Sequence, residues 1–217
     1  MSISIKWIPY HSWFKIQIGD QIIHIDPAFY KAYPGVESEF ADKADFILIT
    51  HAHHDHCDLK AIEKLKKSDT TIIAPISCKN KIIGEFDITE AGAEKTIMGI
   101  NFKTVHAYNI GKNFHPKSFG VGYLISFNNK SIYHAGDTDF IPEMETLGKI
   151  DVALLPIGGT YTMDLMEAVD SLNVINPEIV IPMHQLEADP EKFKEIVEST
   201  TKSKVVILKQ GEVFNCD

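Results

Sequence analysis

Short runs of β-branched and aromatic residues, separated by polar or glycine-containing turns, occupy most of the first fifty positions. Runs of this kind predict β-strands at residues 3–8, 13–18 and 22–25. Residues 46–49 are all apolar, which is typical of a strand buried on both faces. This run ends at Thr50, so the residues that follow it should lie at the C-terminal end of a core strand.

Helical spacing replaces the strand pattern further along. Leu59, Ile62 and Leu65 recur at helical spacing, and Asp58 before them is a residue type that caps helix N-termini. Further helices are predicted at residues 78–83, 165–172 and 190–199. Further strands are predicted at residues 71–74, 97–98, 102–105, 121–127, 131–134, 152–155 and 179–182. Helices interspersed among strands predict an α/β fold, and the chain length favours a single domain spanning residues 1–217.

Composition and charge narrow the class of partner. The 217-residue chain is 44% hydrophobic and 24% charged, which is ordinary for a folded globular protein. Its formal charge of -9 repels polyanions, and the lysines between positions 60 and 67 have the spacing of a solvated helix face. We therefore expect a small-molecule substrate and no nucleic-acid partner. Whether the chain forms a homo-oligomer is left open by the sequence.

The cysteines and the apolar segments bear on localisation. The 3 cysteines form no CxxC pair, and their odd number favours a reducing compartment. The N-terminus has no basic head followed by a long apolar stretch, as a signal peptide would. No segment approaches the roughly 18 consecutive apolar residues that a membrane span requires. The expected location is the cytoplasm, without membrane contact.

The strongest chemical signal is the segment HAHHDH, which follows the predicted core strand and begins at His51. Imidazole and carboxylate groups suit zinc, manganese or iron. On a tightly turning segment, His51 and His53 can reach one ion while Asp55 and His56 reach another. The alternative is a surface histidine run that binds metal adventitiously, but such a run rarely follows a buried strand.

Three further candidates stand at the ends of predicted strands, namely His106, Asp137 and His184. Active sites of α/β sheets collect at strand ends, where loops from several strands converge. Taken singly, each residue has an ordinary alternative, since a lone histidine at a strand end is more often a hydrogen-bonded core or surface residue. Residues 109–118, rich in Gly, Asn, Lys and Pro, predict a long loop after His106, and such loops are often functional.

The sequence resembles the metallo-β-lactamase superfamily, whose HxHxDH signature matches the segment that begins at His51. The later metal-binding His, Asp and His of that family resemble His106, Asp137 and His184 in order and spacing. The resemblance implies a four-layered αββα sandwich that binds two divalent metal ions, with zinc expected and manganese or iron as alternatives. The implied ligands are His51, His53 and His106 for one ion, Asp55, His56 and His184 for the other, and Asp137 as a bridge.

Shorter motifs resemble one branch of this superfamily, which contains ascorbate-6-phosphate lactonase and many uncharacterised metal-dependent hydrolases. They lie at residues 11–12, 25–27, 136–138, 156–159 and 161–163. The branch usually has Gly where this chain has Tyr10, and Ser where it has Ala107. Both departures concern substrate contacts rather than metal ligands.

The resemblance implies hydrolysis by a metal-activated water. Asp55 would orient that water and Asp137 would fix the spacing of the two ions, so both are expected catalytic residues. The substrate would be a small carbonyl ester, a lactone or a phosphoester, and Lys112 and Lys117 in the long loop could meet a phosphorylated metabolite. Weaker candidates for substrate contact or proton donation are His115, His134 and Tyr161.

Three other functions stay open at this point. Iron in related sites supports oxygen chemistry, so a mononuclear iron oxygenase is one alternative. A phosphodiesterase acting on nucleic acid is another, because the same ions serve phosphodiesters, although the acidic balance of the chain weighs against it. A non-catalytic protein that keeps metal for structure is the third. The ligand set argues against it, because structural sites usually close their coordination whereas this one leaves room for water.

Overall fold

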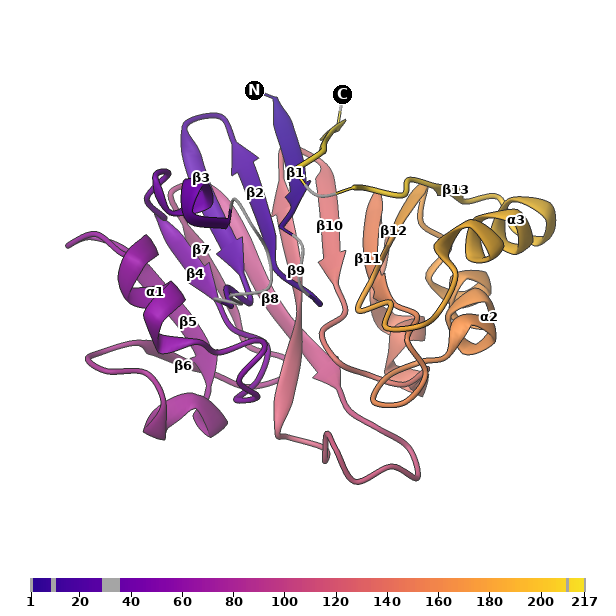
Figure 1. The fold of residues 1–217 in the computed structure, drawn as a ribbon, viewed down its shortest axis with the longest axis horizontal. Coiled ribbons are helices and arrows are strands. Elements are labelled where there is room, and N and C mark those ends of the chain that lie inside the picture. Colours follow the sequence, from indigo (N-terminus) through magenta and orange to yellow (C-terminus); the bar gives the residue numbers. More distant parts are fainter. Residues whose placement is uncertain (1, 9–10, 29–35, 210, 217) are drawn as a thin grey trace. The chain divides into compact units, whose positions relative to one another are not determined.

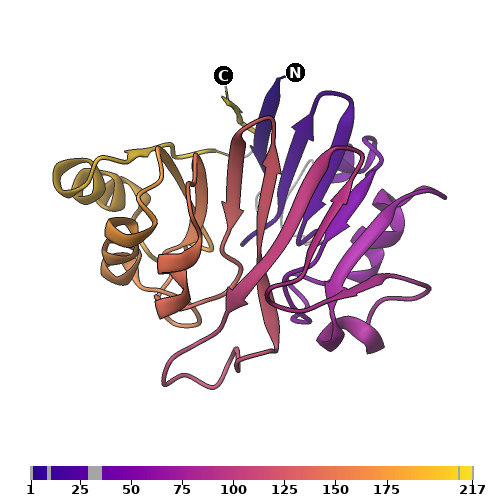
Figure 2. The ribbon, with the colours of Figure 1, turned by 180° about the vertical axis from the view of Figure 1, so that it is seen from behind.

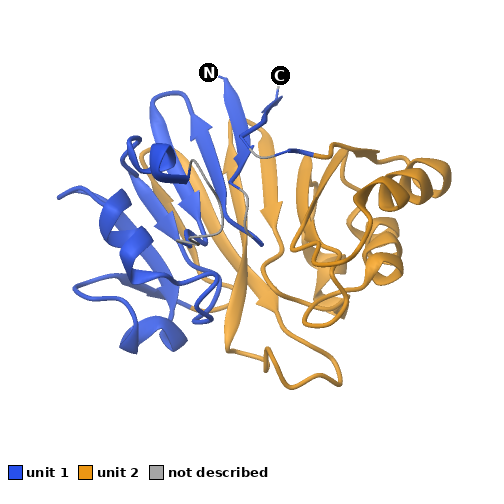
Figure 3. Cartoon of the chain, in the orientation of Figure 1, with its two compact units in different colours: residues 1–89, 208–217 blue, residues 90–207 orange. Residues whose placement is uncertain are grey.

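A computed structural model describes residues 2–8, 11–28, 36–209 and 211–216, so that Tyr10 lies outside the described residues. The chain forms two compact units, each of which contains one β-sheet (Figure 3). Unit 1 comprises residues 1–89 and 208–217, and unit 2 comprises residues 90–207. The expectation of a single domain concerns how the units combine, and it stays a prediction.

Unit 1 is built on a seven-stranded sheet with the strand order β14-β1-β2-β3-β4-β5-β6 (Figure 1). Its strands are β1 (Ile3–Trp7), β2 (Phe14–Ile18), β3 (Gln21–Ile25), β4 (Phe46–Leu48), β5 (Thr71–Pro75), β6 (Asp87–Thr89) and β14 (Val213–Cys216). Neighbours from β14 to β3 pair antiparallel, whereas neighbours from β3 to β6 pair in parallel. The described part of this unit also contains α1 (Leu59–Leu65) and the 3-10 segments η1 (Val36–Phe40) and η2 (Ile76–Asn80).

A row of isoleucines crosses the first three strands of unit 1. Ile5 pairs with Ile16, and Ile16 pairs with Ile23. All three have a relative exposure of 0%, and β-branched cross-strand pairs of this kind stabilise a sheet face. All residues of β4 are buried, as expected for a strand with both faces covered. The parallel strands therefore present their C-terminal ends from a rigid core.

Unit 2 contains a second seven-stranded sheet, with the order β13-β12-β11-β10-β9-β8-β7 (Figure 2). Its strands are β7 (Glu94–Ile97), β8 (Ile100–Ala107), β9 (Gly120–Phe127), β10 (Lys130–His134), β11 (Val152–Pro156), β12 (Ile179–Met183) and β13 (Lys204–Val205). Neighbours from β7 to β10 pair antiparallel, and those from β10 to β13 pair in parallel. The remaining elements are η3 (Pro142–Thr146), α2 (Leu165–Ile175) and α3 (Pro190–Thr200).

Side-chain caps fix the starts of the longer helices in unit 2. Asp164 accepts a hydrogen bond from the backbone N–H of Glu167, and the Glu167 side chain accepts one from the N–H of Asp164. This reciprocal capping box satisfies donors that the first turn of a helix leaves free. Asp189 caps α3 by accepting the backbone N–H of Glu191, without the reciprocal bond. No helix in the described ranges is both long and apolar enough to cross a membrane.

The structure confirms the α/β class and most predicted elements, and it corrects several. Residues 78–83, predicted as a helix, form only the end of η2 and a turn. The strand predicted at 97–98 overlaps β7 only at Ile97, because β7 begins at Glu94 and Met98 lies in the turn that follows it. The short strands β6, β13 and β14 escape prediction because they carry too few alternating apolar residues to produce a signal. Residues 109–118 lie in a loop without regular structure, as predicted.

Candidate metal centre

In unit 1, the candidate residues follow the C-terminal end of β4. This strand pairs in parallel with β3, and the Asp26 N–H donates to the Leu48 carbonyl, so the two strands end side by side. Asp26 has φ of 51°, a left-handed conformation that is unusual for a non-glycine residue. Such backbone strain is kept only where surrounding contacts enforce it. Here it places the Asp26 carboxylate beside the HAHHDH segment.

Asp26 forms hydrogen bonds with residues of and next to the HAHHDH segment. Its Oδ1 accepts the backbone N–H of Thr50 at 2.7 Å, and its Oδ2 lies 2.6 Å from Thr50 Oγ1 and 2.8 Å from His56 Nδ1. Asp26 and His56 both have a relative exposure of 0%. Because a carboxylate only accepts, His56 must carry its proton on Nδ1, which leaves Nε2 as the ring's lone-pair nitrogen. That Nε2 lies 3.5 Å from Asp55 Oδ2.

The same network fixes the His51 ring. The Thr50 hydroxyl donates a hydrogen bond to Asp26, so its oxygen accepts one from His51 Nδ1, which lies 2.9 Å away. His51 Nε2 is therefore a lone-pair nitrogen, and it lies 3.1 Å from His53 Nδ1. Two nitrogens bound tetrahedrally to zinc at about 2.0–2.1 Å would lie about 3.3 Å apart, so this spacing fits a shared metal ion.

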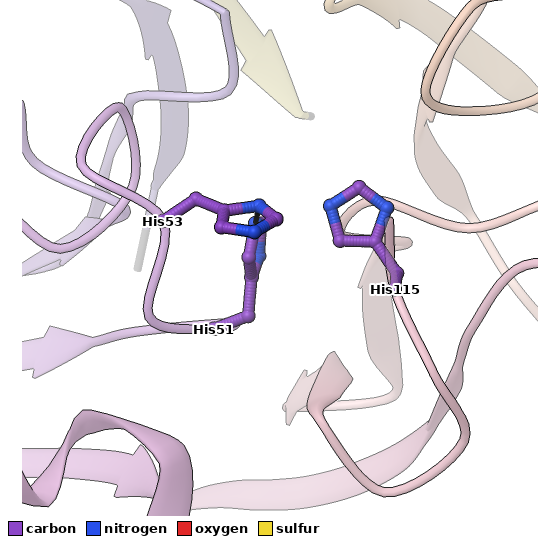
Figure 4. A group of neighbouring side chains, drawn as sticks. All are labelled: His51, His53 and His115. Carbon is purple, nitrogen blue, oxygen red and sulfur yellow. Dashed lines mark hydrogen bonds between the residues drawn. The ribbon is translucent and has the colours of Figure 1, made fainter. Parts of the chain in front are cut away.

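The centroids of the two rings lie 4.7 Å apart, with an interplanar angle of 85°. This edge-to-face arrangement can be followed in Figure 4. The third side chain drawn there, His115, belongs to unit 2. His54, the one histidine of the segment outside the HxHxDH pattern, has 82% of its side chain exposed. His11, also in unit 1, places Nδ1 3.7 Å from Asp55 Oδ2 and has φ of 45°. Sequence reasoning gave His11 no role beyond its motif.

In unit 2, a carboxylate and two histidines form a second cluster. Asp137 Oδ2 lies 3.3 Å from His184 Nε2 and 3.3 Å from His115 Nε2. All three residues are buried. Asp137 follows β10 and His184 follows β12, while His115 comes from the loop between β8 and β9. These spacings also match the edge of a metal coordination tetrahedron, about 3.3 Å for ligands at zinc distances.

Hydrogen bonds determine which nitrogen His115 presents to Asp137. His115 Nδ1 lies 3.0 Å from Asn109 Oδ1 and 3.2 Å from the Tyr161 carbonyl oxygen. The Asn109 orientation is itself fixed, because its Nδ2 donates to Asp139 and to the Tyr161 carbonyl. Both neighbours of Nδ1 are thus acceptors, so Nδ1 carries the proton and Nε2 faces Asp137 as a lone-pair donor.

His106 is placed differently from the other two residues predicted in this half. It lies inside β8, paired with Val121, and is half-buried. Its ring packs edge to face on Tyr108, with centroids 6.3 Å apart. Within the described part of unit 2, it takes no part in the cluster of Asp137 and His184. Its assignment as a metal ligand stays a prediction, and His115 occupies the position beside Asp137.

An ion pair with a buried carboxylate ties the loop that carries His115 to its neighbours. Lys112 Nζ lies 2.8 Å from Asp139 Oδ1 and 2.8 Å from the Thr162 carbonyl. The backbone N–H of Ile110 donates to the second oxygen of Asp139 at 2.8 Å. The exposed fraction of the Asp139 side chain is only 4%. The loop is therefore held by charged hydrogen bonds, which are stronger than neutral ones.

The second loop lysine is also paired. Lys117 Nζ lies 2.8 Å from Glu143 Oε1, and this hydrogen bond lowers the pKa of Glu143 to about 2. Lys117 also sits 4.8 Å from the centre of the Tyr108 ring. Since carboxylates already neutralise both Lys112 and Lys117, the structure offers no support for their expected role with a phosphorylated metabolite.

The remaining weak candidate, His134, lies beside the turn that leads to Asp137, and its role in substrate contact or proton donation stays a prediction. It is fully buried on β10, and its Nδ1 accepts the backbone N–H of Gly136 at 3.2 Å. That bond supports the turn leading to Asp137. Across both units, the imidazole and carboxylate donors are those that zinc, manganese and iron accept. The donor chemistry therefore fits a metal-binding protein.

Comparisons with known proteins point the same way. A model of the beta-lactamase superfamily domain matches residues 4–184 of the chain. A UPF0173 metal-dependent hydrolase of Staphylothermus marinus is 38% identical over 228 residues, covering 94% of this chain and 95% of the relative. Another, of Thermococcus onnurineus, is 36% identical, covering 94% and 96%. Igni18, a metallo hydrolase from Ignicoccus hospitalis, is 28% identical with a TM-score of 0.85, covering 100% of this chain and 99% of that structure.

Proposed function

Because the chain belongs to the metallo-β-lactamase superfamily and is a metal-dependent hydrolase, we propose that it uses two divalent metal ions to hydrolyse a small-molecule ester, lactone or phosphoester. The fold predicted from the sequence is that of this superfamily, and the likeness over nearly the whole chain confirms it. One observation favours metal chemistry most strongly. His56 Nδ1–H donates a hydrogen bond to the buried carboxylate of Asp26, and such carboxylate–histidine pairs orient metal ligands.

The proposed ligands come from both halves of the sequence. They are the residues predicted above: His51, His53, Asp55, His56, His106, Asp137 and His184. The cluster in unit 2 adds His115 as a competitor of His106, because its Nε2 lies 3.3 Å from Asp137. Zinc is the proposed metal, with manganese or iron as alternatives.

When bound, the metal ions would lower the pKa of a water molecule and polarise the substrate's carbonyl or phosphoryl oxygen. The chain's own residues would hold the reacting groups in place. Asp55 Oδ2, which lies close to His56 Nε2 and His11 Nδ1, would orient the attacking water. Asp137 would hold its two histidine neighbours at a constant spacing. Asp26 would act indirectly, by orienting the His56 ring.

The cysteines support the proposed cytoplasmic location. Neither Cys57 nor Cys78 forms a disulfide. Unpaired cysteines are typical of a reducing compartment. The pairing of both loop lysines with carboxylates supports a small substrate over a nucleic acid, since neither cation is left to meet a phosphate backbone.

Metal stoichiometry tests the two-metal proposal first. Elemental mass spectrometry on the wild type should give about two ions per chain, and His56→Ala and Asp137→Ala should each give fewer. Comparing His106→Ala with His115→Ala then identifies which of these two histidines holds metal. A single ion that survives His56→Ala would contradict the proposal.

Turnover tests the reaction class. The zinc-loaded protein should hydrolyse at least one member of a panel of lactones, aryl esters and phosphodiesters, and the same variants should lose that activity. Bound iron together with oxygen uptake, and no hydrolysis, would support the oxygenase alternative instead.

A further inference from the structure

Two aromatic side chains are exposed beside the cluster of unit 2. Phe114 has a relative exposure of 44% and Tyr161 of 39%. Their rings lie edge to face, with centroids 4.7 Å apart and an interplanar angle of 81°. Exposed large aromatic side chains that lie together cost free energy in water, so they often mark a binding surface.

Both residues are immediate neighbours of a proposed metal ligand. Phe114 directly precedes His115, whose Nε2 lies 3.3 Å from Asp137. The backbone carbonyl of Tyr161 lies 3.2 Å from His115 Nδ1. The aromatic pair therefore adjoins the reacting centre through the backbone that positions it. Ile110, on the same loop as Phe114, is also more than half exposed.

The pair rests on a rigid support. The Asn109 side chain joins the two loops, donating to Asp139 and to the Tyr161 carbonyl. Lys112 adds hydrogen bonds to the carbonyls of Gly159 and Thr162. A binding surface that is ordered before the ligand arrives loses little entropy on binding. The two rings are thus held ready rather than free to fold onto the protein.

Charge near the pair points to an uncharged ligand. The two cations of the loop, Lys112 and Lys117, are each 2.8 Å from a carboxylate oxygen. Neither is left to bind a substrate phosphate or carboxylate. The chain neighbours Asn113 and Thr160 are exposed as well, but they are uncharged. The exposed aromatic and aliphatic side chains are suited to the apolar parts of a ligand.

We propose that Phe114 and Tyr161 bind an aromatic or similarly flat apolar group of the substrate, next to the bond that is hydrolysed. This inference rests on the proposed hydrolase function and narrows its substrate class to uncharged esters or lactones with such a group. Tyr161 contributes its ring rather than its hydroxyl. Both are specificity-determining residues, and neither takes part in proton transfer.

A matched pair of product-like ligands tests the binding without needing turnover. Dissociation constants of butyrate and 4-phenylbutyrate are measured by calorimetry on the zinc-loaded protein, so that the ratio isolates the phenyl group. The wild type should favour 4-phenylbutyrate by about tenfold, the range expected for a stacked ring. Phe114→Ala and Tyr161→Ala should each reduce the ratio to about two or less. Tyr161→Phe, which keeps the ring, should retain it.

Met166→Ala is the control, because this exposed side chain lies on α2 in the same unit. It should leave the ratio unchanged, and circular dichroism and zinc content should show that every variant is folded and loaded. A wild-type ratio near one, or a ratio insensitive to Phe114→Ala and Tyr161→Ala, would overturn the inference.

Turnover of γ-butyrolactone and γ-phenyl-γ-butyrolactone separates this inference from the function on which it rests. Hydrolysis of both at equal kcat/KM would support the hydrolase and overturn the aromatic preference. Hydrolysis of neither, nor of any ester in the panel, with a tenfold binding ratio retained, would overturn the proposed hydrolysis while supporting the aromatic site.

Discussion

His56 Nδ1–H donates a hydrogen bond of 2.8 Å to Asp26 Oδ2, and neither side chain is exposed to solvent. The two residues are separated by 30 positions in the sequence, and Asp26 adopts its left-handed backbone at the end of β3 to reach the ring. The bond sets the tautomer of His56, which places a lone pair on Nε2 beside Asp55. Asp26 is thus a positioning residue for a proposed metal ligand.

Asp26→Asn should weaken metal binding while leaving the chain folded. Asparagine tolerates the left-handed backbone, but its amide cannot accept from Thr50 and His56 in the way a carboxylate does. Loss of such an outer partner typically costs 10–100-fold in metal affinity, so we expect a change of about that size in the zinc dissociation constant. Competition with a chromophoric chelator measures it.

Asp20→Asn is the matched control, since Asp20 is an exposed carboxylate in the turn between β2 and β3. It should leave zinc affinity unchanged. Equal affinities for Asp26→Asn and the wild type would contradict the positioning role.

Lys112→Met should destabilise unit 2 by removing one partner of a nearly buried ion pair. Asp139 would keep its bonds from Asn109 and Ile110, so the carboxylate is not wholly abandoned. We expect the free energy of unfolding to fall by about 1–3 kcal/mol, the cost of leaving a buried polar group under-satisfied. Urea denaturation of the metal-free protein measures it.

Lys117→Met serves as its control, because the Lys117 side chain is 55% exposed and pairs with Glu143 at the surface. Exposed ion pairs contribute little, so this variant should unfold at nearly the wild-type midpoint. Equal midpoints for the two variants would show that the Lys112 pair does not anchor the loop.

The elements that can be predicted from the sequence are those whose burial leaves a clear apolar pattern. The apolar run at 46–49 identifies β4 because both of its faces are covered, and the predicted cap at Asp58 marks the start of α1. The closeness of the donor atoms in the HAHHDH segment is predictable for a different reason. Its donors lie next to one another in the chain, so spacing alone brings His51 and His53 together.

The rest of the candidate site depends on contacts between distant residues. The roles of Asp26 and Asn109 come from hydrogen bonds that sequence spacing does not encode. The apolar pattern predicts a strand that ends before His106, whereas β8 extends to Ala107 and so includes His106. His115 reaches Asp137 because Lys112 and Asp139 fold the loop back. The ion pairs of Lys112 and Lys117 with distant carboxylates are tertiary contacts as well. The sequence shows the two lysines but not their partners, so it favours a phosphate-binding role.

Gly158→Ala should displace His184. A Cβ at position 158 would lie 2.4 Å from the His184 carbonyl oxygen and 3.0 Å from Leu186 Cγ. His184 already has φ of 44°, so its backbone has little freedom to retreat. Overpacking of this kind costs about 1–3 kcal/mol, and the shifted His184 should weaken zinc binding as well.

Gly148→Ala separates the two effects of that substitution. Position 148 has open space around the added Cβ but φ of 77°, so alanine there is strained without touching a ligand. It should lower stability by about 1 kcal/mol and leave zinc affinity unchanged. Unaltered zinc affinity in Gly158→Ala would show that His184 is not positioned by this contact.

His24 should make the stability of the metal-free protein depend on pH. Burial, and then the nearby charge of Lys15, lower the pKa of His24 from 6.5 to about 3, and Trp13 Nε1 donates to its Nδ1 at 3.0 Å. Between these two pH values the unfolded chain binds a proton that the folded chain does not. The free energy of unfolding should therefore fall as the pH falls through this window, by up to about 1.4 kcal/mol per pH unit from this residue.

His24→Asn isolates that contribution, because its Oδ1 can still accept from Trp13 but the side chain does not titrate. Urea unfolding from pH 6.5 to 4 in the presence of a chelator should show a shallower pH dependence for the variant than for the wild type. The difference should approach one proton bound on unfolding at the acidic end. If the two proteins showed the same dependence of unfolding free energy on pH, the folded protein would accommodate a charged His24. The hydrogen bond from Trp13 would then not keep the ring neutral.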